Sequence, residues 1–166
     1  FKRLIMIAIN ILIILMLPLL SFIMQLILPK SIDRVKAYLS SLIILASLVI
    51  SFSALIQIYE LSKMTLIDKL SFALTNTALS KIEFSWVSLP NLQINFGIIS
   101  DSISVVMLLV VSLISFLIHI FSIEYMAGDK RFSRYYAYLG LFTFSMNGVV
   151  VSNNLFFTFI FWELVG

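Results

Sequence analysis

Two titratable side chains, Glu163 and His119, stand in apolar surroundings where gaining or losing a proton would change their energy strongly. No Asp, Glu, Lys, Arg or His occurs from Tyr135 to Trp162, and Glu163 follows directly. An ionised carboxylate within a membrane span costs about 2.5 kcal/mol or more, so it usually faces a protein interior, a water-filled cavity or a cation. Because desolvation raises the pKa of a carboxyl group and a nearby cation lowers it, a cation that moves toward and away from Glu163 would unload and load a proton. The alternative is a neutral glutamate that is hydrogen-bonded near an interface.

His119 lies about one helical turn before the polar segment 124–134. An imidazole titrates near neutral pH, so His119 could relay protons between that segment and the interior. The alternative is an interfacial histidine that is hydrogen-bonded to the backbone. Asp101 precedes another apolar run, where a carboxylate favours the positive end of a helix dipole, and we expect it to cap that helix.

The composition removes several other kinds of chemistry. The chain has no Cys and one His, which excludes disulfides, thiolate metal sites, iron–sulfur ligation and sites of several histidines. We therefore expect no cofactor and no metal site in this chain. The net charge is +3, and the basic residues stand between long apolar runs rather than on one face. We expect no nucleic-acid partner.

The elements that position these residues are membrane helices. The chain is 61% hydrophobic and only 11% charged, so it is predicted to be an integral membrane protein. Four apolar runs of about spanning length occupy 4–28, 37–59, 102–123 and 135–151. A fifth helix begins near Asn154 but is too short to cross within this sequence. The predicted fold class is an all-α transmembrane helix bundle of about five spans, the fifth incomplete.

A different pattern separates the second and third runs. Segments 84–89 and 92–96 flank Pro90-Asn91, and the second segment alternates apolar and polar residues. We predict a small β-hairpin outside the bilayer. The chain then divides into two N-terminal helices (1–61), an extramembrane segment with the hairpin (62–101) and the remaining helices (102–166).

The basic residues indicate how the helices are oriented. Those of the first and third connections are expected to face the matrix or cytoplasm by the positive-inside rule: Lys30, Arg34, Lys36, Lys130, Arg131 and Arg134. We interpret all of them as anchors in loops or at helix ends, which leaves no intramembrane cation for Glu163. Four aromatic side chains flank the runs as an interfacial belt would: Trp86, Tyr125, Tyr135 and Tyr136.

Several segments, taken in order, resemble a known family. They are FGIISDSIS (96–104), LIHIFSIEYM (117–126), RFSRYYAYL (131–139), NNL (153–155) and WELVG (162–166). In this order they are similar to subunit 5 of mitochondrial respiratory complex I and its bacterial counterpart, an antiporter-like membrane subunit. The resemblance covers 96–166. Residues 1–95 resemble the family only in their order of elements, two spans followed by a hairpin.

The resemblance implies that this sequence is the N-terminal part of a larger subunit with two inverted repeats. It implies that Glu163 is a protonatable residue of the proton pathway and that its partner lysine lies on a later helix. Leu164 stands where most members have Gly, and Asn153 where many have Asp. The sequence would then be a fragment or a split gene product, continued by another chain after Gly166.

The implied protein is a non-redox, proton-translocating subunit of NADH:ubiquinone reductase in the mitochondrial inner membrane, or in a bacterial plasma membrane. Its expected partners are other membrane-arm subunits of complex I and membrane lipids. Two alternatives stay open: a subunit of a related sodium/proton antiporter complex or membrane-bound hydrogenase, and a purely structural membrane-arm fragment.

Overall fold

The fold is given by a computed structural model, which describes residues 2–29, 33–62, 80–89 and 92–166. Three parts of the sequence-based prediction lie outside the described residues: Lys30, the turn at Pro90-Asn91, and the stretch 63–79 of the second connection.

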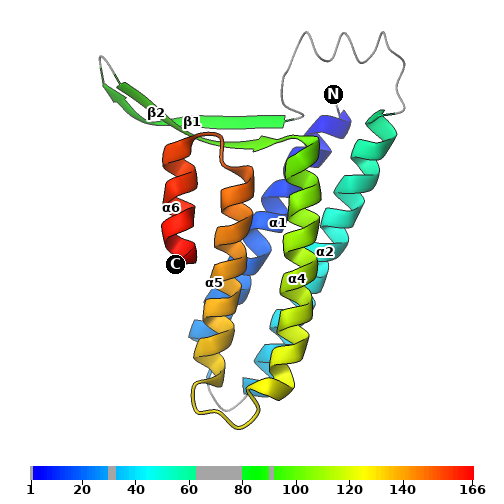
Figure 1. The fold of residues 1–166 in the computed structure, drawn as a ribbon, viewed down its shortest axis with the longest axis vertical. Coiled ribbons are helices and arrows are strands. Elements are labelled where there is room, and N and C mark those ends of the chain that lie inside the picture. Colours follow the sequence, from blue (N-terminus) through cyan, green and yellow to red (C-terminus); the bar gives the residue numbers. More distant parts are fainter. Residues whose placement is uncertain (1, 30–32, 63–79, 90–91) are drawn as a thin grey trace.

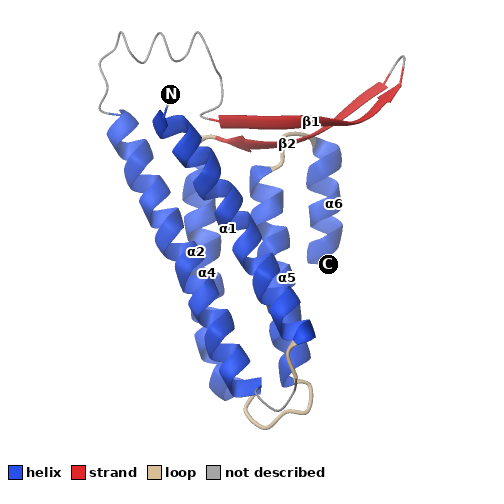
Figure 2. Cartoon of the chain, turned by 180° about the vertical axis from the view of Figure 1, so that it is seen from behind, coloured by secondary structure: helices blue, strands red, loops and turns tan. Residues whose placement is uncertain are grey.

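Long helices form a bundle that a β-hairpin crosses at one end (Figure 1). The described helices are α1 (Lys2–Ile27), α2 (Asp33–Ser62), α4 (Ser102–Tyr125), α5 (Phe132–Val151) and α6 (Leu155–Val165). Helix α1 packs most extensively on α5 and α2, and α2 packs on α4. Helix α6 packs on α5, and it starts beneath the hairpin (Figure 2). We call the end with the hairpin the hairpin end, and the opposite end, with the connections α1–α2 and α4–α5, the loop end.

Length and composition confirm the all-α membrane bundle. Among the described residues, three helical segments are long and apolar enough to cross a membrane: Met6–Ile27, Asp33–Glu60 and Ser102–Tyr125. Helix α5 also has spanning length, with 20 residues, but its interior includes Thr143, Ser145 and Asn147, which lower its hydropathy. Helix α6 has 11 residues, as expected for the incomplete fifth helix.

The predicted β-hairpin is confirmed and is longer than the alternating pattern indicated. Strands β1 (Ser80–Leu89) and β2 (Leu92–Ser100) pair antiparallel, with Phe84 opposite Phe96. The register shifts between Ser85 and Val87, so one extra residue of β1 forms an irregularity. Pairing of the whole of both strands depends on backbone hydrogen bonds, which side-chain alternation signals only in part.

The bundle core at the hairpin end is apolar. It is formed by Ile7, Ile11, Ile14, Leu15, Ala54, Val105, Leu108 and Val151.

Helices α5 and α6 approach each other closely at Gly148. A Cβ added there would lie 2.3 Å from the Phe161 ring. Helices α5 and α6 can therefore meet at this point only because residue 148 has no side chain.

A proline within α1 explains one polar contact in this core. Pro18 has no backbone N–H, so the carbonyl of Ile14, four residues earlier, loses its usual helical donor. Asn147 of α5 donates to that carbonyl, with Nδ2 3.3 Å from the oxygen. A neighbouring helix thus satisfies the backbone group that Pro18 frees.

Candidate functional site

His119 is fully buried on α4, in contact with α5. Its Nδ1–H donates to the carbonyl of Ser115 at 2.8 Å, and the hydroxyl of Tyr136 donates to the His119 carbonyl at 2.7 Å. Since a carbonyl only accepts, the Nδ1 nitrogen carries the hydrogen, and Nε2 presents a lone pair. That Nε2 atom is buried and has no hydrogen-bond partner among the described residues. It is a buried hydrogen-bond acceptor that no described group uses.

His119 belongs to a continuous polar stripe on the buried face of α4. The buried residues of this helix follow alternating steps of three and four: Val105, Leu108, Ser112, Ser115, His119 and Ser122. The two nearest the hairpin end are apolar, and the four toward the loop end are polar. We call these four residues the polar stripe. Polar groups buried in a membrane helix cost free energy unless they are bonded, so their clustering requires partners on neighbouring helices.

Helices α2 and α5 supply those partners. The Ser115 hydroxyl lies 2.5 Å from that of Thr143, which itself donates to the Leu139 carbonyl, so Ser115 is the donor of the pair. By the same reasoning Ser112 donates to Ser51, at 3.2 Å, because Ser51 donates to the carbonyl of Ser47. The hydroxyls of the stripe are satisfied, and only the histidine nitrogen is left over.

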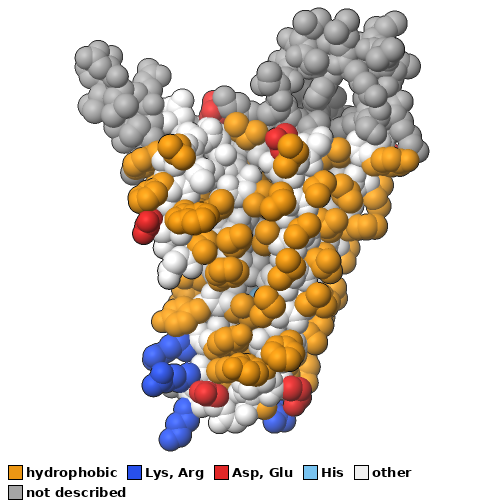
Figure 3. Space-filling model, in the orientation of Figure 1, with side chains coloured by type: hydrophobic (Ala, Val, Ile, Leu, Met, Phe, Trp, Pro, Cys, Tyr) orange, Lys and Arg blue, Asp and Glu red, His pale blue; other side chains and the backbone are white. Residues whose placement is uncertain are grey.

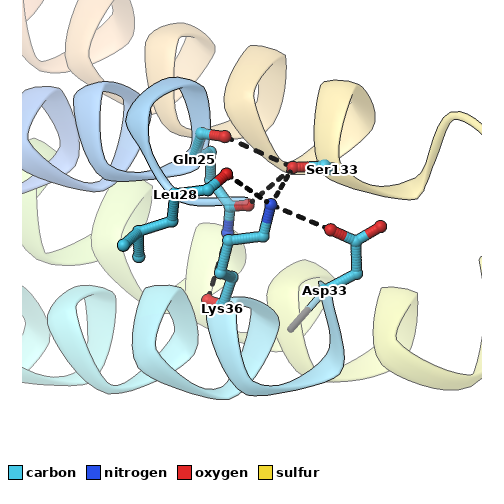
Figure 4. Close-up of polar contacts among 5 residues, drawn as sticks. All are labelled: Gln25, Leu28, Asp33, Lys36 and Ser133. Carbon is cyan, nitrogen blue, oxygen red and sulfur yellow. Dashed lines mark hydrogen bonds and ion pairs between the residues drawn. The ribbon is translucent and has the colours of Figure 1, made fainter. Parts of the chain in front are cut away.

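A second buried polar centre lies at the loop end, around Lys36 (Figure 4). Its side chain is completely buried, and its ammonium nitrogen forms an ion pair with Asp33 at 2.8 Å. The same nitrogen donates to the Ser133 hydroxyl at 2.5 Å and to the Leu28 carbonyl at 3.3 Å. Gln25 donates to the Lys36 carbonyl at 3.1 Å. The three N–H groups of one lysine thus join α1, α2 and α5.

The interpretation of Lys36 as a loop anchor is therefore wrong. Lys36 lies in the first turn of α2 and points into the bundle, because it is in register with the buried face of that helix. That face consists of Lys36, Ala37, Ser40, Ser41, Ile44, Ser47, Ser51 and Ala54. Its helical spacing was present in the sequence and could have identified Lys36.

The other described basic side chains agree with the anchor prediction. Lys and Arg gather at the loop end on the face shown in Figure 3, while apolar side chains cover the surface above them. Arg34, Lys130 and Arg131 are exposed there. Of the predicted aromatic belt, Tyr125 is exposed, but Tyr136 is fully buried against His119 and was wrongly assigned.

Glu163 lies near the end of α6 and is exposed in this chain. Its carboxylate forms no hydrogen bond or ion pair with the described residues. The structure does not join this carboxylate to His119 or Lys36. Phe161, two residues earlier, is the buried side chain of α6 and packs on Phe144 and Phe157. The part of the chain that the structure describes therefore does not provide the protein cover that the sequence predicts for the Glu163 carboxylate.

Asp101 caps α4, as predicted. Its Oδ1 accepts from the backbone N–H of Ser104 at 2.6 Å. Hydrogen bonds from the Ser104 hydroxyl and backbone N–H hold the pKa of the Asp101 carboxyl below its ordinary value of 3.8. In the described part of the chain, no group of three or more His, Asp or Glu side chains is placed to hold a metal.

Comparisons with known proteins agree with the resemblance seen in the sequence. The family model for the N-terminus of chain 5 of NADH-ubiquinone oxidoreductase (complex I) matches residues 86–136, which include the whole polar stripe. NADH-ubiquinone oxidoreductase chain 5 of Cryptococcus neoformans var. grubii is 39% identical over 93 residues, which are 56% of this chain and 14% of that protein.

Two further relatives extend the comparison. Chain 5 of Chondrus crispus is 38% identical over 105 residues, 63% of this chain and 16% of that protein. The chloroplastic NAD(P)H-quinone oxidoreductase subunit 5 of Anthoceros angustus is 35% identical over 138 residues, 82% of this chain and 17% of that protein. This chain thus spans about one sixth of the length of its relatives. Their names and the apolar helices support the predicted localisation, a multi-pass inner membrane protein. Together, the matches confirm that this chain is a relative of the N-terminal part of the chain 5 subunits of complex I.

Proposed function

We propose that this chain is the N-terminal part of a proton-translocating membrane-arm subunit of respiratory complex I. The observation that carries the proposal is the match of residues 86–136 to complex I chain 5. The relatives named above are subunits of enzymes that oxidise NADH or NAD(P)H with a quinone. With no Cys and a single His, this chain would contribute no redox centre, and the electron transfer would take place in other subunits of the mitochondrial complex.

In this proposal Glu163 gains and loses the transported proton. A carboxylate on an apolar helix does so when its surroundings change between a cation nearby and none. Lys36 is engaged by Asp33, Ser133 and Leu28, so it is not the mobile cation. The proposal therefore assigns the cation of Glu163 to a lysine on a later helix, as the resemblance implies.

His119 has the second role, as a proton relay within the polar stripe. Two features support it: the free lone pair on the buried Nε2, and the bond from Nδ1 to Ser115 that fixes the tautomer. A merely structural histidine needs only the Nδ1–H group. His119→Asn retains an amide donor near that position and removes Nε2, so it should leave assembly intact and lower proton translocation.

The test uses membrane vesicles that hold the assembled complex, with proton uptake and NADH oxidation measured together. Glu163→Gln should lower the number of protons moved per NADH, whereas Glu124→Gln, at an exposed position beside the α4–α5 connection, should leave it unchanged. Unchanged translocation in Glu163→Gln, with normal assembly, would leave a structural role only. If the complex copurifies without NADH-oxidising flavin subunits, the antiporter or hydrogenase alternative replaces the proposal.

A further inference from the structure

The two residues directly before α6 are bonded to both strands of the hairpin. Asn154 caps α6, since its Oδ1 accepts from the Phe157 N–H at 2.8 Å. Its Nδ2 donates to the Asn95 carbonyl of β2 at 2.6 Å. The residue that starts the helix is thus held directly by a strand.

Asn153 makes a second set of bonds beside the first. Its Nδ2 donates to Oε1 of Glu83 on β1 at 2.8 Å, and its backbone N–H donates to the Gly97 carbonyl of β2 at 3.2 Å. Its Oδ1 accepts from Nδ2 of Asn154 at 2.8 Å. One asparagine therefore uses its backbone and both ends of its amide to join β1, β2 and the start of α6.

The hairpin is shaped to admit this asparagine. A Cβ at Gly97 would lie 2.1 Å from Nδ2 of Asn153 and 2.8 Å from Cγ of Glu83, so only glycine fits. Next to it, Ile98 forms an isolated antiparallel bridge with Ser152 at the end of α5. We call Glu83, Asn95, Gly97, Asn153 and Asn154 the hairpin clamp.

We propose that the hairpin clamp fixes the start of α6 and that Asn153 and Asn154 are thereby positioning residues for Glu163, an inference that rests on the function proposed above. Glu163 is nine residues beyond the cap, about 14 Å along the same rigid helix. Apart from the clamp, α6 is held by ring contacts: Phe157 packs on Phe96 of β2, and the buried Phe161 packs on Phe144 of α5. A displacement of the start of α6 therefore also displaces the Glu163 carboxylate.

The clamp requires a donor at position 153. An amide there donates to the Glu83 carboxylate, whereas Asn153→Asp would oppose two carboxylates at hydrogen-bond distance. Among the described side chains of β1, β2 and α6, the other titratable group is Glu163 itself. Asp101, between β2 and α4, is engaged by Ser104, and the titratable side chains of α5 lie in its loop-end half: Arg134, Tyr135, Tyr136 and Tyr138. Adding Glu83→Gln to Asn153→Asp restores one donor and one acceptor with their positions exchanged.

The experiment measures the clamp and the function separately, in membrane vesicles with the assembled complex. Because the chain has no Cys, Ile98→Cys with Ser152→Cys introduces the only thiol pair in it. Bridge partners lie within disulfide reach, so the rate of oxidative cross-linking reports contact between the hairpin and the end of α5. Protons moved per NADH are measured in matched variants without the cysteines.

We expect Asn153→Asp to slow cross-linking about threefold to fivefold and to lower the number of protons moved per NADH. Glu83→Gln alone should change neither quantity, and combined with Asn153→Asp it should restore both. Failure of the double variant to recover, or unchanged cross-linking in Asn153→Asp, would overturn the clamp. Slower cross-linking with unchanged translocation would overturn the positioning role. Glu163→Gln tests the proposed function by itself, because it should leave cross-linking unaltered.

Discussion

The two ends of the bundle have interiors of opposite character. Toward the hairpin, α1 and α4 bury aliphatic side chains such as Ile7, Ile11 and Val105. Toward the loop end, the same two helices bury Gln25 and His119, and α2 and α5 add further polar groups: Lys36, Ser40, Ser133 and Tyr136. In lipid, apolar packing distinguishes weakly between protein and membrane, whereas polar contacts specify partners. The contrast indicates that the choice of which helices pack together is specified mainly at the loop end.

The polar end itself contains two different kinds of centre. The Lys36 ammonium donates two hydrogen bonds and forms an ion pair with Asp33, so it is engaged on three sides and acts as a structural joint. His119 keeps one buried nitrogen without a partner among the described residues. A polar group whose interactions are all made stabilises the fold, whereas a nitrogen with a free lone pair can accept a proton. The following predictions test the structural role of Lys36 and the contrast between the ends.

The largest effect is expected at Lys36. Lys36→Met removes the charge and leaves the Leu28 carbonyl and the Ser133 hydroxyl without their donor, while Asp33 can still reach water. We expect the free energy of unfolding to fall by about 2–4 kcal/mol, measured by denaturation in mild detergent. Arg34→Met, an exposed change two residues earlier, should cost less than about 0.5 kcal/mol. Equal losses in the two variants would contradict a structural joint at Lys36.

An intermediate effect is expected at the polar exception in the apolar end. Asn147→Leu should cost about 1–2 kcal/mol, because the Ile14 carbonyl loses its donor in the buried core. In a Pro18→Ala background, residue 18 regains an N–H that can bond this carbonyl, so the same change should cost less. A double-mutant cycle of unfolding free energies should give a coupling of about 1 kcal/mol. Additive losses would show that Pro18 does not create the need for Asn147.

The smallest effect is expected at the edge of the hairpin end. Asp101→Ala removes the α4 cap and should cost about 1 kcal/mol near neutral pH. The folded-state pKa of Asp101 is lowered, so its contribution is present above its ordinary value of 3.8 and is lost as the pH falls through the lower folded-state pKa. The stability difference between the parent and Asp101→Ala should therefore shrink in acid. Asp101→Asn, which caps without titrating, should show a difference from Asp101→Ala that does not depend on pH.

Features that depend on a short stretch of neighbouring residues were predictable from the sequence. The apolar runs, the alternation in β2 and the carboxylate at Asp101 each depend on neighbouring residues, and the structure confirms the helices, the hairpin and the cap. The burial of His119 was left open between two readings, although Ser112, Ser115 and Ser122 share its helical spacing and mark a polar face.

Features that depend on which helices touch were not predictable in this way. Lys36 looked like a loop residue because it is the last residue of the polar stretch 29–36, and only its contact with α5 reveals its role. The roles of Asn153 and Asn154 depend on their hydrogen bonds to the hairpin, which the sequence does not show. The environment of Glu163 stays a prediction, since no described residue covers it.

The bond between Asn147 and the Ile14 carbonyl also constrains how the protein is made. The two residues are 133 positions apart, so a chain that enters the membrane from its N-terminus inserts α1 long before α5 exists. During that interval the Pro18 gap faces lipid or a helper protein with an unpaired carbonyl, which favours a temporary partner for α1 during biogenesis. When α5 packs on α1, Asn147 supplies the donor that the Ile14 carbonyl lacks until then.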